Sequence, residues 1–136
     1  MTGSKAKTTV LAVDDNEVNL MILVSLLKKH FSFDVLTATN GKEALDCANR
    51  FPLGAVFMDC DMPIMDGIEA TRRIRQLSDP NKSDVPIMAI TANGTPSNRQ
   101  ACLAAGMSEV LVKPLDIKKI KSFCSSLNRS NKASSA

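Results

Sequence analysis

The sequence lacks any apolar run approaching the roughly 20 residues that a membrane-spanning helix needs. Its first eight residues are polar and do not resemble a secretory signal peptide. It also shows no internal repeat and no second domain. The 136 residues, 44% of them hydrophobic and 23% charged, suffice for one domain with a sizeable core. We therefore expect a domain over residues 9–127, a flexible leader over 1–8 and a disordered tail over 128–136.

Features typical of a zinc site are also missing. The four cysteines form no CxxC pair and have no histidine nearby: Cys47, Cys60, Cys102 and Cys124. This spacing indicates free thiols in a reducing compartment. The single histidine, His30, falls near the end of an expected helix, without a neighbour that suggests catalysis.

The body of the chain has little excess positive charge. The net charge is +3, yet four cations lie in terminal segments that hold no acidic residue: Lys5, Lys7, Arg129 and Lys132. Nucleic-acid-binding domains usually carry a basic face on the fold itself. The one basic cluster, at residues 118–121, is interpreted as a solvated helix face. We predict neither a nucleic-acid partner nor direct membrane contact.

Short apolar runs alternate five times with segments of helical character. The strands are expected at 9–13, 33–38, 55–59, 86–91 and 110–112, and the helices at 17–30, 42–50, 68–77, 97–105 and 117–127, with a polar loop at 78–85. Asn16 and Asp116 are expected N-caps, Pro96 suits a first helical turn, and Gly106 ends a helix. The alternation predicts an α/β fold, a doubly wound (βα)5 flavodoxin-like domain with a parallel sheet of order 2-1-3-4-5.

The first helix carries more apolar residues than one buried stripe requires. One side would hold Ile22, Leu23, Leu26 and Leu27. The other would hold Leu20, Met21 and Val24. Two interpretations stay open: a patch that docks a partner, or an unusually buried helix.

Side chains able to do chemistry follow four of the five expected strands: Asp14 with Asp15, then Asp59, Thr91 and Lys113. The carboxyl ends of parallel strands share one sheet edge, so we expect these groups to converge. Three clustered carboxylates stay ionised only beside a compensating cation, and Mg²⁺ prefers such oxygen ligands. Lys113 adds positive charge and Thr91 a hydroxyl. The pattern predicts phosphoryl transfer, with Asp59 as the nucleophile that forms an aspartyl phosphate.

These residues, together with MPIMDG at 62–67 and Lys113-Pro114, resemble the receiver domain of two-component response regulators over residues 9–127. The segment TANGTPSNRQACLAAGM resembles receivers attached to hybrid histidine kinases in phosphorelays. The resemblance implies that Asp59 accepts a phosphoryl group from a histidine kinase or histidine phosphotransfer protein, with Mg²⁺ as cofactor and slow self-dephosphorylation. It also implies a cytoplasmic domain, on the intracellular side if it belongs to a membrane-bound kinase.

The resemblance further implies a role for each site residue. Asp15 and Asp59 would bind Mg²⁺ directly, with the backbone carbonyl of Asp61, while Asp14 acts largely through water. Thr91 and Lys113 would contact the phosphoryl oxygens, Lys113 would pair with Asp59 beforehand, and Lys113-Pro114 would be a cis peptide. Partner docking would involve Leu20, Met21 and Val24.

Two positions depart from the family pattern. Val110 stands three residues before the lysine, where many receivers carry an aromatic residue that moves with the threonine. Asp61 adds an acidic side chain two residues after the nucleophile. We interpret Asp61 either as a solvated loop charge or, with Asn93, as a residue that adjusts the lifetime of the phosphorylated state.

Three other functions fit parts of the sequence. Asp59-Cys60-Asp61 has the DxD spacing of haloacid-dehalogenase-type phosphatases, but Met62-Pro63 follows it and two aspartates lie upstream. Flavin binding on the same fold would need a phosphate-cradling loop after the first strand, where Asp14 and Asp15 would repel a phosphate. A non-phosphorylated interaction module is disfavoured because every residue for phosphorylation is present, although Val110 keeps this alternative open.

Overall fold

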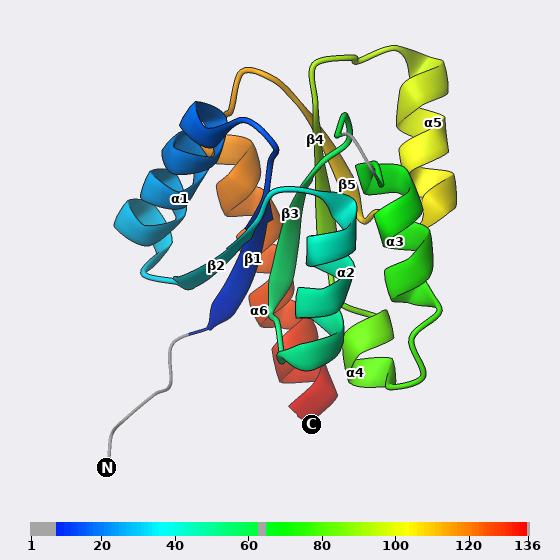
Figure 1. Ribbon diagram of the computed structural model, residues 1–136. Helices are drawn as coiled ribbons and strands as arrows, with labels where there is room; N and C mark the ends of the chain where they lie inside the picture. Colours follow the sequence, from blue (N-terminus) through cyan, green and yellow to red (C-terminus); the bar gives the residue numbers. More distant parts are fainter. Residues whose placement is uncertain (1–7, 63–64, 136) are drawn as a thin grey trace.

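The computed structural model describes residues 8–62 and 65–135 of the chain, in which one parallel sheet lies between two layers of helices (Figure 1). The strands follow the order β2-β1-β3-β4-β5 and pair in parallel throughout. They are β1 (Thr9–Val13), β2 (Asp34–Ala38), β3 (Ala55–Asp59), β4 (Ile87–Thr91) and β5 (Glu109–Val112). The helices are α1 (Glu17–Phe31), α2 (Gly41–Arg50), α3 (Gly67–Arg75), α4 (Pro80–Ser83), α5 (Pro96–Ala105) and α6 (Ile117–Ser135). The predicted α/β fold and strand order are confirmed.

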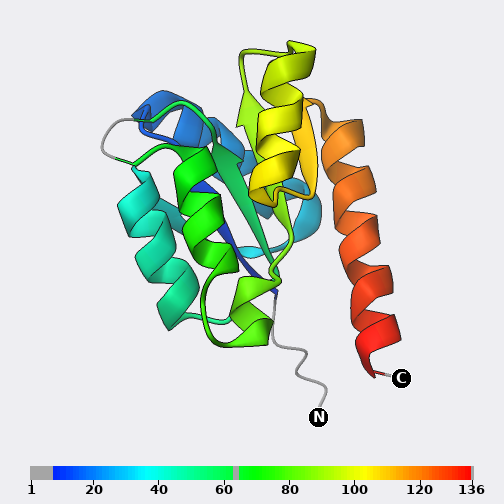
Figure 2. The same cartoon turned by 90° about the vertical axis from the view of Figure 1, so that its right-hand side faces the viewer.

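The side chains of each strand divide alternately between two hydrophobic cores, as the period of two in a strand requires. Val56 and Met58 of β3 enter the core covered by α2, α3 and α5, whereas Ala55 and Phe57 enter the core covered by α1 and α6. Figure 2 shows α6 on one side of the sheet and α2 and α3 on the other. The Phe57 ring meets Phe123 of α6 edge-on, with ring centroids 5.6 Å apart. β3 is therefore buried on both faces up to Asp59.

The expected helix signals act as predicted. The Asn16 side chain accepts a hydrogen bond from the Asn19 amide at the start of α1. Asp116 likewise accepts from the Lys118 amide ahead of α6. Pro96 occupies the first turn of α5, and Gly106 ends that helix with φ of 112°, a left-handed backbone that favours glycine.

The structure differs from the expected boundaries at three places. α4 forms inside the segment expected to be a polar loop, because Asp79 caps it and Pro80 begins it. α6 continues past the expected end at 127 to Ser135, and its last residues contain no proline or glycine that would stop a helix. The carbonyl oxygen of Thr8, placed in the expected leader, accepts a hydrogen bond from the Asp34 amide; residues 1–7 of the leader lie outside the described residues.

The sequence assigned the faces of α1 incorrectly. Leu23 and Leu27 are buried, with Leu20 and Val24 packed beside them against the core, so Leu20 and Val24 lie on the buried side. The exposed apolar side chains are instead Val18, Met21 and Ile22, at 63%, 66% and 50% exposure. The core stripe thus runs through positions 20, 23, 24 and 27, the spacing of a helix lying on a sheet.

Candidate functional site

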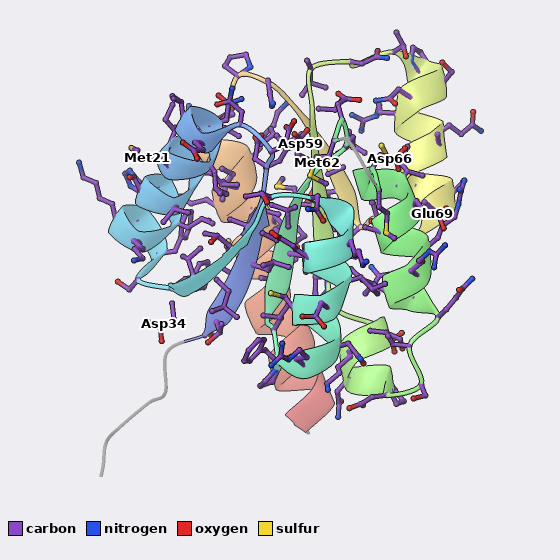
Figure 3. All side chains as sticks on the ribbon, viewed as in Figure 1. Met21, Asp34, Asp59, Met62, Asp66 and Glu69 are labelled. Atoms are coloured by element: carbon purple, nitrogen blue, oxygen red, sulfur yellow. The ribbon has the colours of Figure 1, made fainter. Side chains whose placement is uncertain are left out.

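Three aspartates meet where β1 and β3 end side by side. Val13 pairs with Met58 in the sheet, so Asp14 and Asp15 emerge next to Asp59. One carboxylate oxygen from each of the three lies within 4.8 Å of the others. Figure 3 places Asp59 at the upper edge of the sheet, opposite Asp34 at the start of β2. The predicted convergence of these carboxylates is therefore present.

The cluster has a buried floor and an exposed rim. Asp14 and Asp59 are 5% and 3% exposed, while Asp15 is exposed. Backbone amides hold the two buried side chains in place: Asp59 Oδ1 accepts from the Asp61 amide at 3.1 Å, and Asp14 Oδ1 accepts from the Asn16 amide at 2.9 Å. Each backbone amide binds only one oxygen, so each of the two buried carboxylates has a second oxygen that no backbone amide occupies.

Burial raises the pKa of Asp59 to about 6. Loss of solvation is the largest cause, and the charge of Asp14 adds to it. The Asp61 amide and the charge of Lys113 act in the opposite direction. The positive charge of Lys113 thus does not offset burial and the neighbouring carboxylate, as expected of a carboxylate cluster that binds a cation.

Lys113, which follows β5, reaches the cluster from the far side of β4. Its Nζ lies 3.9 Å from Asp14 Oδ2. The resemblance implied a pair with Asp59, but the ion pair present is with Asp14. The side chain is 31% exposed, which leaves Nζ within reach of a group bound at the sheet edge. The Lys113-Pro114 peptide is cis, as the resemblance implied.

Thr91 closes β4, the strand beside β3, and is wholly buried. Its Oγ1 accepts a hydrogen bond from the Asn93 amide at 3.0 Å and a longer one from Asn98 Nδ2 at 3.4 Å. Sequence reasoning missed Asn98. It lies seven positions after Thr91, and only the turn between β4 and α5 brings the two together.

Asp66 and Gly67, from the MPIMDG segment, bring α3 against the end of β3. Asp66 caps α3 by accepting from the Glu69 amide at 2.8 Å. A Cβ at position 67 would collide with the carbonyl oxygen of Asp59, so only glycine permits this approach. The Gly67 amide donates to the Cys60 carbonyl at 3.2 Å. Pro63 and Ile64, in the same segment, lie outside the described residues.

The two departures from the family pattern lie in different surroundings. The Asp61 side chain is exposed and stands outside the three-aspartate cluster of the described residues, although its backbone amide binds Asp59. Val110 is buried in the core beneath α5 and pairs with Ala89 of β4. A small aliphatic side chain thus occupies the position where many receivers carry an aromatic ring.

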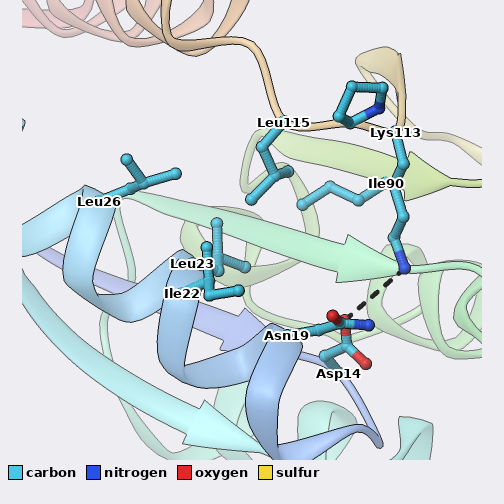
Figure 4. A pocket seen from close by; sticks show the side chains of 9 residues that line it. Asp14, Asn19, Ile22, Leu23, Leu26, Ile90, Lys113 and Leu115 are labelled. Atoms are coloured by element: carbon cyan, nitrogen blue, oxygen red, sulfur yellow. Dashed lines mark ion pairs between the residues drawn. The ribbon is translucent and has the colours of Figure 1, made fainter.

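A pocket of about 340 Å³ lies between α1 and the segment that follows β5. Its walls are mostly apolar, and the Asp14–Lys113 ion pair closes the end nearest the carboxylates (Figure 4). Its lining residues are Asn19, Ile22, Leu23, Leu26, Ile90, Pro114 and Leu115, with the ion pair. Ile22, one of the three exposed apolar residues of α1, therefore borders the site itself.

Among the described residues, no helix combines the length and the apolar character that a membrane crossing requires.

Comparison with known proteins places these features in one family. Residues 10–124 match the family model described as response regulator receiver domain. The chain is 44% identical to hybrid signal transduction histidine kinase B of Dictyostelium discoideum over 78% of this chain and 6% of that protein. The chain spans 6% to 12% of the length of the curated relatives it matches.

Two solved structures share both fold and sequence with the chain. The receiver domain of sensor histidine kinase PA1611 from Pseudomonas aeruginosa, which has a magnesium ion in its active site cleft, is 35% identical, with a TM-score of 0.79 over 91% of this chain and 97% of that one. A Saccharomyces cerevisiae co-crystal structure holds the phosphotransfer protein Ypd1 with the receiver domain of Ssk1. It matches at 32% identity and a TM-score of 0.74, over 85% of this chain and 84% of that one.

Proposed function

The chain belongs to the response regulator receiver domain family, and from that premise we propose that Asp59 accepts a phosphoryl group from a phosphohistidine. The observation that carries the proposal is the meeting of Asp14, Asp15 and Asp59 at one sheet edge, with Lys113 3.9 Å from Asp14. Phosphoryl transfer depends mainly on positioning and on neutralising charge, and this edge provides both kinds of group.

In the proposed step, an Asp59 carboxylate oxygen forms a bond to phosphorus while the phosphorus–nitrogen bond of the phosphohistidine breaks. The imidazole nitrogen leaves with the bonding electron pair, and Asp59 becomes an aspartyl phosphate. With a pKa of about 6, Asp59 is ionised in most molecules at neutral pH and can act as the nucleophile. Later attack by water on phosphorus would release phosphate and restore the carboxylate.

The donor set fits Mg²⁺, which favours carboxylate oxygens and retains several waters. We assign Asp15 and Asp59 as direct ligands, with the Asp61 carbonyl, and Asp14 as a ligand that acts through water. The three carboxylate oxygens lie within 4.8 Å of one another, whereas two ligands about 2.1 Å from one ion lie at most about 4.2 Å apart, so at most a small side-chain movement would bring all three to one ion. When bound, Mg²⁺ supplies positive charge that offsets the carboxylates and the phosphoryl oxygens. The magnesium ion of the PA1611 receiver supports this assignment.

Lys113 and Thr91 would hold the transferred group. Lys113 Nζ is a point charge on a flexible side chain and would turn from Asp14 to a phosphoryl oxygen. The Thr91 hydroxyl would donate a hydrogen bond to another phosphoryl oxygen. Both residues therefore act on the charge that moves with the phosphoryl group.

The exposed apolar face of α1 is the proposed docking surface for the phosphotransfer partner. Of the residues implied at first, Met21 is exposed, while Leu20 and Val24 serve the core. We therefore assign docking to Val18, Met21 and Ile22, beside the pocket that the Asp14–Lys113 pair closes. A partner helix on this face would place its phosphohistidine near Asp59. The Ypd1 complex of a related receiver supports a partner of this class.

The likeness to hybrid kinases favours a larger protein of which this domain is the receiver, on the cytoplasmic side of the cell. There the domain would catalyse only its own phosphorylation and dephosphorylation and pass the signal on.

The test is phosphorylation by acetyl phosphate with and without Mg²⁺. A phosphate-affinity gel follows the reaction, because the chain has no tryptophan or tyrosine whose fluorescence could report it. Wild type should acquire one phosphate that hydroxylamine removes, as an acyl phosphate requires, and only with Mg²⁺, whereas Asp59→Asn should acquire none. Asp34→Asn, which changes an exposed carboxylate at the opposite sheet edge, serves as the matched control. A wild type that stays unmodified, or an Asp59→Asn variant labelled equally, would overturn the proposal.

A further inference from the structure

The hydrogen bonds around Thr91 leave its hydroxyl one direction in which to donate. A threonine hydroxyl can accept two hydrogen bonds and donate one. The Asn93 amide and Asn98 Nδ2 both donate to Thr91 Oγ1, at 3.0 and 3.4 Å. Among the described residues, Thr91 Oγ1 donates no hydrogen bond of its own. The hydroxyl hydrogen is therefore directed away from both donors.

A second contact determines which atom of the Asn98 side chain faces Thr91. The group 2.7 Å from the carbonyl oxygen of Asn93 must be the amide nitrogen, because a carbonyl only accepts. The same nitrogen has a second hydrogen, which it can donate to Thr91 Oγ1 at 3.4 Å. Asn98 thus offers Thr91 a donor and never an acceptor.

The turn between β4 and α5 keeps Asn98 in this position. The Asn98 amide donates to Thr95 Oγ1 at 3.3 Å, and the Thr95 amide donates to Asn93 Oδ1 at 3.1 Å. Asn98 is only partly buried, yet backbone and side chain are both bound within the turn. The Asn98 side chain is therefore already held beside Thr91, and it would lose little further rotamer freedom when a phosphoryl group binds.

We propose that Asn98 is a positioning residue for phosphoryl transfer: it holds Thr91 Oγ1 as an acceptor, so that the hydroxyl hydrogen points toward the phosphoryl group on Asp59. The inference rests on the proposed function and adds a residue to it. It also gives Thr91 a polar connection to the first turn of α5, in a chain whose Val110 supplies no aromatic side chain for that purpose.

The test is a double-mutant cycle on acetyl phosphate labelling with Asn98→Ala, Thr91→Ala and the double variant. Asn98→Ala should slow labelling about 3- to 10-fold, the value of one ordinary hydrogen bond. Thr91→Ala should slow it at least as much, and the double variant should match Thr91→Ala within about twofold, because Asn98 acts only through that hydroxyl. Gln100→Ala, an exposed change on the same helix, should label at the wild-type rate.

Two further measurements separate positioning from folding. Asn98→Asp keeps the side-chain shape and suits a first helical turn, yet it removes both donors, so it should fold normally and slow labelling as Asn98→Ala does. In nuclear magnetic resonance spectra, beryllofluoride with Mg²⁺ should shift the Asn98 side-chain amide signals of wild type and leave them nearly unmoved in Thr91→Ala.

The outcomes distinguish this inference from the proposed function. Wild-type labelling with an unchanged rate in Asn98→Ala, or with an equal Asn98→Ala effect in the Thr91→Ala background, would overturn the role of Asn98 and leave Asp59 as the acceptor. An absence of Asp59-dependent labelling in wild type would overturn both.

Discussion

Lys113 Nζ lies 3.9 Å from Asp14 Oδ2, which makes Asp14 its ion-pair partner. The charge of Lys113 still lowers the pKa of Asp59, but this effect is smaller than that of burial, which raises the pKa of Asp59. Asp59 therefore keeps an oxygen that neither Lys113 nor the Asp61 amide occupies. A nucleophile needs such an oxygen, so the pairing of Lys113 with Asp14 is compatible with attack by Asp59.

Removal of the Lys113 charge should slow phosphorylation. We expect Lys113→Ala to reduce the rate of labelling by acetyl phosphate at least about tenfold, because one electrostatic contact to the phosphoryl oxygens is lost. Labelling time courses on phosphate-affinity gels measure the rate. Lys118→Ala, an exposed lysine in the first turn of α6, is the control and should label as wild type does. Equal rates for Lys113→Ala and wild type would contradict the assigned contact.

Asp59→Asn should stabilise the fold without Mg²⁺ at neutral pH. The folded-state pKa of about 6 is above the ordinary value of 3.8, so the folded state binds more protons than the unfolded state between these values. Wild type therefore becomes less stable as the pH rises from about 4 to about 6, and this loss of stability persists above pH 6. We expect a gain on the order of 1 to 3 kcal/mol at pH 7 that vanishes near pH 4.

Urea unfolding followed by circular dichroism at pH 4 and pH 7 measures this difference. Asp34→Asn should change stability little at either pH, because that carboxylate is exposed. A gain for Asp59→Asn of equal size at both pH values would show that titration of Asp59 is not its cause.

Mg²⁺ should raise the thermal unfolding midpoint of wild type, and EDTA should reverse the rise. A ligand that binds only the folded state stabilises it by RT ln(1 + [L]/Kd). Asp15→Asn removes an exposed carboxylate of the cluster and should reduce the Mg²⁺-dependent rise at each concentration. Calcium at matched ionic strength tests size selectivity. An Asp15→Asn response equal to that of wild type would remove Asp15 from the ligand set.

A charge on the exposed face of α1 should block transfer from a protein donor and leave the chemistry intact. We expect Met21→Glu to lower transfer from a phosphorylated histidine phosphotransfer protein about tenfold or more, because a buried charge without a partner is costly at an interface. Labelling by acetyl phosphate should remain as in wild type. Phe51→Glu is the control, since Phe51 is 41% exposed and follows α2 at the opposite sheet edge. Equal loss in both variants would place docking elsewhere.

Local sequence signals account for most of the fold. Asn16 and Asp116 cap their helices, Pro96 opens α5 and Gly106 ends it, because each depends on a few neighbouring residues. Asp79-Pro80 carries the signal for α4 as well, although the polar residues around it predict a loop. The buried face of α1 was predicted wrongly because the helix carries apolar residues on more than one side. Its rotation is then decided by the sheet, which takes Leu20 and Val24 into the core.

By itself, the sequence determined which groups stand at the carboxyl ends of the strands. Five alternations of strand and helix require a parallel sheet, and such a sheet brings Asp14, Asp15 and Asp59 to one edge wherever the loops run. Only the tertiary structure decided how those groups pair. The contact of Lys113 with Asp14, the raised pKa of Asp59 and the Asn98 donor to Thr91 depend on separations of a few ångströms and on burial. Both are set by the packing of distant segments, which no local pattern specifies.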